Sequence, residues 1–155
     1  MMDEMYLREA TKEDCNILFE WVNDSVTRQN SFNSEVITYD KHCEWFNNSL
    51  KNCQRVQLIL EKNNIALGQI RFDFDVNYLE AEVSYSIAPK YRLNGYGTKI
   101  IKLGVEYIQK NYPSVCMIKG KVKPGNIGSY RSFINNKFLE TYRSLEFHIS
   151  KEKQM

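Results

Sequence analysis

One segment of the chain decides the fold, and it reads Ile87-Ala88-Pro89-Lys90-Tyr91-Arg92-Leu93-Asn94-Gly95-Tyr96-Gly97-Thr98. An alternating strand pattern precedes this segment, and an apolar pattern with helical spacing follows it. Gly95 and Gly97 allow main-chain conformations that other side chains forbid, and they let a ligand approach the backbone closely. The segment therefore predicts a strand, a glycine-containing turn and a helix in succession.

This turn has the chemistry of a phosphate site. The first amides of a helix have no partner within the helix, and they lie at the positive end of its dipole. Arg92 adds a cation that can bind a phosphate through two hydrogen bonds. Known phosphate loops fit poorly, because no Walker A sequence is present and Ile100 stands where a dinucleotide fingerprint needs its third glycine. Taken alone, the pattern is equally consistent with a turn that only connects a strand to a helix.

The elements around the turn predict an α+β fold with a mixed, mostly antiparallel, twisted sheet of six to seven strands and about four helices. The expected strands cover residues 5–9, 56–61, 65–74, 79–87 and 115–122, with one or two more in 138–150. The expected helices cover residues 11–22, 38–52, the stretch from the turn to about 110, and 126–136. Residues 23–34 are polar and are expected to form a loop.

Composition narrows the class of protein. A chain of 155 residues predicts a single domain over 1–155. The net charge of +2 argues against a nucleic-acid partner, and no apolar run is long enough to span a membrane. The N-terminus lacks the features of a signal peptide, so we expect a cytoplasmic protein. The four cysteines form no C-x-x-C pair, so free thiols and no metal are expected.

Two motifs resemble those of a known family. The pattern Arg92-x-x-Gly95-x-Gly97, preceded by Tyr85-x-Ile87-x-Pro89, resembles the acetyl-CoA signature of the GNAT N-acetyltransferase superfamily. The downstream segment Val122-Lys123-Pro124-Gly125-Asn126-Ile127-Gly128-Ser129 is similar to the family's second cofactor motif. The resemblance covers residues 5 to 150 approximately, and it implies the GNAT fold with acetyl-CoA as co-substrate and no metal.

The resemblance also implies roles for individual residues. Main-chain groups of Ile87 and its neighbours would pair with the pantetheine arm like an added strand, and Asn126 and Ser129 would contact the same arm. The pyrophosphate would be held by Arg92 and by the main-chain amides of the turn, which are those of Leu93, Asn94, Gly95, Tyr96, Gly97 and Thr98.

The chain departs from the family pattern at two places. Lys137-Phe138 stands where many members have Gly-Phe before the last strand, and Phe133 stands where many have the tyrosine that protonates the leaving thiolate. Phenylalanine cannot donate a proton, so Tyr130 is the nearest alternative for the general acid. Because a thiol has a pKa of only about 8.5, a missing acid should cost less than the usual hundredfold to ten-thousandfold.

The front half of the chain suggests the acceptor. Its pattern is Trp21-x-Asn23-Asp24-x-x-x-Arg28-x-x-Ser31-Phe32, then His42-x-x-Trp45-Phe46. This order resembles a GNAT subgroup that acetylates nucleotide-linked 4-amino-4,6-dideoxy sugars in the pseudaminic acid pathway. The resemblance implies that Arg28 faces the nucleotide diphosphate and His42 the nucleotide or sugar, and we expect Tyr85 on the acceptor side as well. The residues alone also allow a surface Arg28 and a structural His42.

The expected reaction is direct attack of the free amine on the thioester. An amine beside electron-withdrawing sugar oxygens should need little help to lose its proton, so a carboxylate acting through water would suffice. Glu82 is the best candidate for this base, although an exposed charge at a strand end is an equally good interpretation. A backbone amide near Ile87 is expected to stabilise the oxyanion.

Three functions fit these features of the sequence. The first is acetylation of a nucleotide-linked amino sugar, with a small-molecule substrate. The second is acetylation of protein N-termini or small amines, and the third is a non-catalytic acyl-CoA-binding module, which Phe133 supports best. An exposed last strand could also pair two protomers, so a homodimer is possible.

Overall fold

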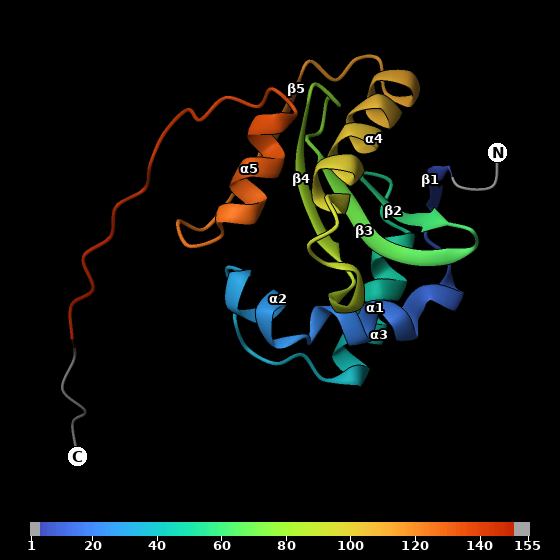
Figure 1. Cartoon of the computed structure of the whole chain (residues 1–155), viewed down its shortest axis with the longest axis horizontal. Helices are drawn as coiled ribbons and strands as arrows, with labels where there is room; N and C mark the ends of the chain where they lie inside the picture. Colours follow the sequence, from blue (N-terminus) through green and yellow to red (C-terminus); the bar gives the residue numbers. More distant parts are fainter. Residues whose placement is uncertain (1–3, 151–155) are drawn as a thin grey trace.

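The computed structural model describes residues 4–150, and it has one five-stranded sheet in the order β1-β2-β3-β4-β5 (Figure 1). The strands are β1 (Met5–Glu9), β2 (Arg55–Lys62), β3 (Ile65–Phe74), β4 (Glu80–Ile87) and β5 (Met117–Gly120). Neighbouring strands run antiparallel except β4 and β5, which are parallel. The expected α+β fold with a mostly antiparallel mixed sheet is therefore confirmed, whereas the expected six to seven strands are wrong.

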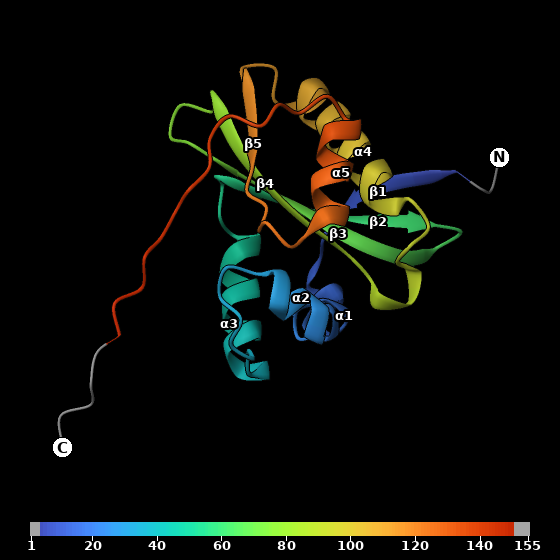
Figure 2. The same ribbon diagram turned by 60° about the vertical axis from the view of Figure 1, so that its left-hand side comes forward.

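Helices cover both faces of the sheet (Figure 2). One layer holds α1 (Cys15–Val22), α2 (Ser25–Asn30) and α3 (Tyr39–Leu50), and the other holds α4 (Tyr96–Asn111) and α5 (Ile127–Asn135). Short 3-10 turns, η1 (Lys12–Asp14) and η2 (Pro89–Tyr91), precede α1 and follow β4. Period-two alternation explains the layers, because successive strand residues face opposite sides of a sheet.

The main core lies between the sheet and α4. Ile70 and Phe72 of β3 are fully buried there, beside Ile100 and Ile101 of α4. Gly104 permits the close approach of helix and sheet, because a Cβ atom at this position would lie 2.7 Å from Ile70 Cδ1 and 2.9 Å from the ring of Phe72. A smaller core on the opposite face joins α1 and α3 to β2 through five buried residues, namely Leu18, Trp21, Phe46, Ile59 and Ala88.

The stretch expected to be a loop over 23–34 contains helix α2. The Asp24 side chain caps this helix by accepting a hydrogen bond from the Thr27 amide at 3.1 Å. An aspartate before a helix start is a recognised signal, since its carboxylate satisfies an amide that the helix leaves free. The short helix carries no buried residue, so the sequence offers no apolar stripe that would have predicted it.

The C-terminal stretch differs most from expectation. Residues 138–150 form no strand, and in both views the segment runs away from the rest of the molecule (Figures 1 and 2). The expected strand over 115–122 is also shorter, since β5 covers only Met117–Gly120. A strand needs a hydrogen-bonding neighbour, and no backbone bond from residues 139–150 to another described residue is present.

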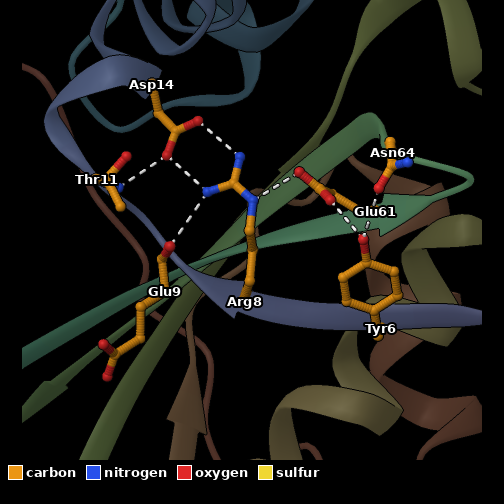
Figure 3. A network of polar contacts seen from close by, with 7 residues as sticks. All are labelled: Tyr6, Arg8, Glu9, Thr11, Asp14, Glu61 and Asn64. Carbon is orange, nitrogen blue, oxygen red and sulfur yellow. Dashed lines mark hydrogen bonds and ion pairs between the residues drawn. The ribbon is translucent and has the colours of Figure 1, made fainter.

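A polar network connects the short 3-10 turn η1 to strands β1 and β2 of the sheet (Figure 3). The Arg8 guanidinium donates to both oxygens of Asp14 at 2.8 Å and, through Nε, to Glu61 at 2.6 Å. Burial alone would raise the pKa of each carboxyl, but the hydrogen bonds to Arg8 and to Thr11 or Tyr6 outweigh it, so both pKa values lie below the usual range. The network therefore joins β1, η1 and β2.

Candidate active site

A groove opens where strand β5 stops accompanying β4. The two strands pair only over residues 80–83, so β4 continues through residues 84–87 without a strand neighbour on that side among residues 4–150. The groove has a volume of about 470 Å³. It is lined by α2 with the loop after it (Val26, Thr27, Asn30, Ser31, Phe32), by residues 83–87 of β4, by the glycine turn (Tyr91, Arg92, Leu93, Gly95, Tyr96, Gly97) and by Lys121, Asn126, Gly128, Ser129, Ser132 and Phe133.

The N-terminus of α4 presents free amides to this groove. Gly95 has φ +76°, in the left-handed region that favours glycine, and no side chain caps the helix. At Gly97 a Cβ atom would lie 2.9 Å from Ser132 Oγ and 3.4 Å from the Tyr85 hydroxyl, so glycine keeps this wall open. Asn94 holds the turn through Nδ2, which donates to the Tyr91 and Arg92 carbonyls. Such an arrangement suits a phosphate or pyrophosphate.

Arg92 connects the turn to helix α2. Its Nη2 donates to Asp24 Oδ2 at 2.7 Å and to Thr27 Oγ1 at 3.0 Å. Burial would raise the pKa of the Asp24 carboxyl, but the hydrogen bonds from Arg92 and from the Thr27 amide outweigh it and hold this pKa low. The Nη2 atom is therefore occupied by hydrogen bonds within the protein. The Nε and Nη1 atoms make no hydrogen bond within the described part of the chain.

A pair of hydroxyl groups lies at the opposite wall. The Tyr85 hydroxyl donates to Ser129 Oγ at 3.1 Å, and Asn126 caps α5 by accepting from the Ser129 amide at 3.2 Å. Phe133 lies edge-on to Tyr85 with ring centroids 5.8 Å apart, and it also packs edge-on with Phe138, with centroids 4.9 Å apart. The residue at the usual acid position therefore lines the groove with a ring that has no proton to donate, while the Tyr85 hydroxyl lies near Gly97 in the first turn of α4 and Ser129 in the first turn of α5.

Most of the residues expected to bind the cofactor come together in the groove. Ile87, Arg92, Leu93, Gly95, Tyr96, Gly97, Asn126 and Ser129 all line it, and so does Tyr85, which was expected on the acceptor side. Asn94 and Thr98 are not among the lining residues; Asn94 holds the turn through Nδ2, and the Thr98 carbonyl accepts a hydrogen bond from Asn136 Nδ2.

The two expected catalytic residues lie outside the groove. Tyr130 is exposed, and its hydroxyl donates to Glu140 at 3.3 Å. Glu82 is about half exposed and pairs with the Lys121 ammonium at 3.4 Å, on the face of the sheet that also carries Ser84 and Ser86. The geometry places Glu82 beside the groove and turns Tyr130 away from it.

Arg28 holds a loop in place through the hydrogen bonds of its guanidinium. Its Nε donates to the Val22 carbonyl at 2.6 Å, and Nη1 donates to the carbonyls of Asn33 and Glu35. Its remaining nitrogen donates to Ser31 Oγ at 3.1 Å. Every nitrogen of this guanidinium therefore holds the chain between α1 and α3, and Arg28 does not line the groove.

His42 is a core residue. Only 4% of it is exposed, its ring stacks parallel on Phe46, and its Nε2–H donates to the Cys15 carbonyl at 2.9 Å. Burial lowers its pKa, with the Cys15 carbonyl opposing that effect in part. The histidine thus joins α1 to α3 as a neutral ring, away from the groove.

Sequence reasoning missed the contribution of α2 and of the outward face of β4. Thr27 of α2 lines the groove together with Ser84 and Ser86, and so do Ser31 and Phe32, which belong to the acceptor pattern quoted above but had no role assigned to them. The sequence did indicate that the two serines share one face of a strand, because they alternate with apolar Val83, Tyr85 and Ile87 on the strand that leads into the glycine turn. Nothing in the sequence indicated a role for the residues of α2, because they were expected to be part of a polar loop.

The groove suits a long ligand with an amide-bearing arm and a pyrophosphate. The free edge of β4 can pair with extended amides, and the start of α4 can bind phosphate oxygens. These are the two chemical features of coenzyme A, so the residues present fit this cofactor. Within residues 4–150 no group of three His, Cys, Asp or Glu side chains could hold a metal ion, and no helix there is long and apolar enough to cross a membrane.

Comparison with known proteins gives the family. The family model described as an acetyltransferase (GNAT) domain matches residues 4–138. The chain therefore belongs to the GNAT acetyltransferase family, and it is an enzyme of the acetyl-CoA-dependent N-acetyltransferase class. No curated protein matches it at a significant level.

Solved structures support the same fold. A spermidine N-acetyltransferase from Vibrio cholerae, in complex with CoA and spermine, has a TM-score of 0.84 at 17% identity, covering 94% of this chain and 88% of that one. The aminoglycoside acetyltransferase AAC(6')-Ib with coenzyme A and kanamycin has a TM-score of 0.78 at 20% identity, covering 89% and 86%. A GNAT-family acetyltransferase from Bacillus anthracis has a TM-score of 0.72 at 21% identity, covering 87% and 80%.

Proposed function

We propose that the enzyme transfers the acetyl group to the amine of a nucleotide-linked amino sugar of the UDP-4-amino-4,6-dideoxy type. The observation that carries this proposal is the absence of acidic residues from the groove lining. None of the described lining residues is Asp or Glu, while the two lining cations, Arg92 and Lys121, pair with the carboxylates of Asp24 and Glu82 just outside it. Thr27, Ser31 and Ser84, which carry hydroxyl groups, also line the groove. Such a lining favours an anionic acceptor rich in hydroxyls over a polycation.

The acetyl-CoA contacts follow from the geometry of the groove. The β4 edge at Ile87 pairs with the pantetheine arm, and the amides from Leu93 to Thr98 bind the pyrophosphate together with the free edge of Arg92. Asn126 holds the start of α5 in place, so that Ser129 faces the sulfur end of the arm. The role of Asn126 is therefore to position Ser129.

Tyr85 is the best-placed donor for the leaving thiolate. Its hydroxyl lies in the groove, already within hydrogen-bond distance of Ser129, whereas Tyr130 points to Glu140. The amine attacks the thioester carbonyl, the C–S bond breaks, and the Tyr85 hydroxyl stabilises or protonates the departing sulfur. Glu82 takes the proton of the amine through water, and a backbone amide near Ile87 binds the oxyanion.

Arg28 and His42 of the front half act on the acceptor only through the residues that they hold in place. Arg28 folds the chain around Ser31 and Phe32, and His42 supports α1 against α3, so both are positioning residues. Phe32 is 68% exposed at the groove rim, with the Lys123 ammonium 6.0 Å from its ring centroid. An aromatic face beside a cation suits a nucleobase and its adjoining phosphate.

The acceptor class is tested by a kinetic comparison. We would measure kcat/KM for acetyl transfer to a UDP-4-amino-4,6-dideoxy sugar, spermidine, kanamycin and a pool of N-terminal peptides. The nucleotide sugar should be acetylated at least about tenfold more efficiently than any of the cationic amines. Preferred acetylation of spermidine, kanamycin or peptides would show that another acceptor class uses this groove. A cytoplasmic location and a homodimer stay part of the same proposal.

A further inference from the structure

Two thiols from different helices lie in contact on the face of the sheet that carries α1 to α3. All four cysteines are free in the structure, and among them Cys15 of α1 and Cys43 of α3 have their sulfur atoms 3.4 Å apart. The two residues are 28 positions apart in the chain, so the fold brings them together. The other two cysteines, Cys53 and Cys116, are exposed, and Cys116 Sγ donates to a backbone carbonyl at 3.2 Å.

The packing of α1 on α3 holds this pair of thiols in register. His42 Nε2–H donates to the Cys15 carbonyl at 2.9 Å, and the Tyr39 hydroxyl donates to Asn16 Oδ1 at 2.7 Å. Both helices also share a buried apolar core. The two cysteines are next to residues that make these contacts, so the helices themselves fix how closely the sulfur atoms approach.

The two sulfur atoms are near enough to bond after a small movement. A disulfide has an S–S distance of about 2.05 Å, so the atoms must approach each other by about 1.4 Å. Modest rotations of the two side chains supply such a movement without a change in the fold. Both residues are half-buried, so a small oxidant has access to them.

We propose that Cys15 and Cys43 are a reversible disulfide pair, oxidised by exchange with a low-molecular-weight disulfide such as oxidised glutathione. The Cys43 thiolate attacks one sulfur of the small disulfide and expels the first glutathione thiol. Cys15 then loses its proton, attacks Cys43 Sγ of the mixed disulfide and expels the second. The two protein sulfurs are oxidised, the small disulfide is reduced to two thiols, and the two protons of the protein thiols end on these products.

The surroundings of Cys15 suit it to the second step. Burial, together with the hydrogen bond to Cys43, raises the pKa of the Cys15 thiol to about 11, so this residue stays protonated at neutral pH. A protonated thiol reacts slowly with a dissolved oxidant, because the thiolate is the nucleophile. Against a mixed disulfide on Cys43 the same thiol is already in contact with the sulfur that it attacks.

The bond would join the two helices that bracket one wall of the groove. Residues 23–38, between α1 and α3, include α2 and the groove-lining Thr27, Ser31 and Phe32. The Asn23 side chain already joins the ends of this segment, because it donates to the Ile37 carbonyl at 2.6 Å and accepts from the Ile37 amide at 2.8 Å. A covalent bond between the helices therefore limits how far the ends of the segment can separate.

The test is oxidation of the native protein in buffers with graded ratios of oxidised to reduced glutathione, followed by mass spectrometry. The wild-type protein should lose two hydrogen atoms and yield a crosslinked peptide that contains Cys15 and Cys43. The double variant Cys53→Ser/Cys116→Ser is the matched control and should form the same bond. Cys15→Ser should instead keep a glutathione adduct on Cys43, because no second thiol is present to expel it.

Thermal unfolding of the oxidised and reduced proteins is the second measurement. The oxidised form should unfold at a temperature at least about 5 °C higher, because the crosslink reduces the conformational entropy of the unfolded chain. The double variant Cys15→Ser/Cys43→Ser should unfold at the same temperature with and without oxidised glutathione.

Two outcomes would overturn the proposal. One is the absence of the crosslinked peptide at every glutathione ratio, which would mean that the two sulfurs do not react with each other in the folded protein. The other is a crosslink that lowers the unfolding temperature, which would mean that α1 and α3 must move apart to accept it. Neither measurement uses acetyl-CoA or an acceptor, so the result does not depend on the proposed function.

Discussion

At the scale of the residue, the Tyr85 hydroxyl is the most consequential atom of the site. It lies at the meeting point of β4, the start of α4 and the start of α5, next to Ser129 Oγ. A sequence pattern could name the strand and the motif, but it could not show which of two tyrosines faces the groove. Tyr130 is only one residue from Ser129, yet helical geometry points its side chain in a different direction.

Replacement of this hydroxyl tests the assignment. Tyr85→Phe should lower kcat by about tenfold to a hundredfold, with a much smaller change in KM for acetyl-CoA, because the hydroxyl acts on the leaving sulfur. Tyr130→Phe should keep at least half of the wild-type kcat. Steady-state thiol release measures both. If Tyr130→Phe loses the activity and Tyr85→Phe does not, the proton donor has been assigned to the wrong residue.

The Arg8 network gives a second prediction at this scale. Arg8→Met leaves two buried carboxylates without their cation, so it should lower the unfolding free energy at pH 7 by about 3 kcal/mol. Asp14 and Glu61 have lowered pKa values in the folded protein, so the stability they contribute is present above their unfolded pKa values, about 3.9 and 4.3, and is lost as the pH falls through the folded ones.

The difference between Arg8→Met and wild type should therefore shrink as the pH falls below about 4. Urea unfolding at a series of pH values measures it. Arg143→Met is the matched control, because Arg143 forms a single exposed ion pair with Glu140, and its loss should leave the unfolding free energy almost unchanged. A loss in Arg8→Met that does not vary with pH would mean that the carboxylates do not depend on this arginine.

At the scale of the element, the contact between α4 and β3 sets the position of the glycine turn that precedes α4. Gly104→Ala places a methyl group within 3 Å of Ile70 and Phe72, so the helix must shift outward. We expect a loss of about 1–3 kcal/mol in unfolding free energy, despite the higher helix propensity of alanine. Thermal unfolding measures this loss.

The matched control is Gly128→Ala, in which the added methyl group meets no atom within 4 Å. It should keep or slightly raise the stability, because alanine favours helices. Equal losses in the two variants would contradict the view that α4 is held at close range by Gly104.

The elements that were predicted correctly from the sequence have a regular hydrophobic periodicity or a recognisable turn motif. The strand over residues 79–87, the glycine turn and the helix after it appear in the structure as expected, because alternation, Gly95 and the apolar spacing all favour the same arrangement. Helix α2 was not predicted, since its one signal is the cap at Asp24 and it buries no side chain. Arg28 and His42 were assigned to the ligand because sequence shows residue type but not which partners satisfy it.

At the scale of the whole molecule, the fold places two layers of helices so that a groove forms where β5 ends. The side of this groove proposed for the cofactor was predictable, because two sequence motifs, over residues 87–98 and 122–129, build most of it. The side proposed for the acceptor draws on α2, the loop after it and the outward face of β4, which are distant in sequence and meet only in the folded chain. The C-terminal segment was expected to be a strand of the same sheet, and in the single chain no strand partner for it exists within residues 4–150.

One structure would test the placement of the chemistry most directly: a crystal structure of the enzyme with coenzyme A. We predict that the pyrophosphate binds the main-chain amides from Leu93 to Thr98, that the pantetheine pairs with β4 near Ile87, and that the sulfur lies within hydrogen-bond distance of the Tyr85 hydroxyl. A sulfur positioned next to Tyr130, or a cofactor bound outside the groove between β4 and α5, would contradict this account of the site.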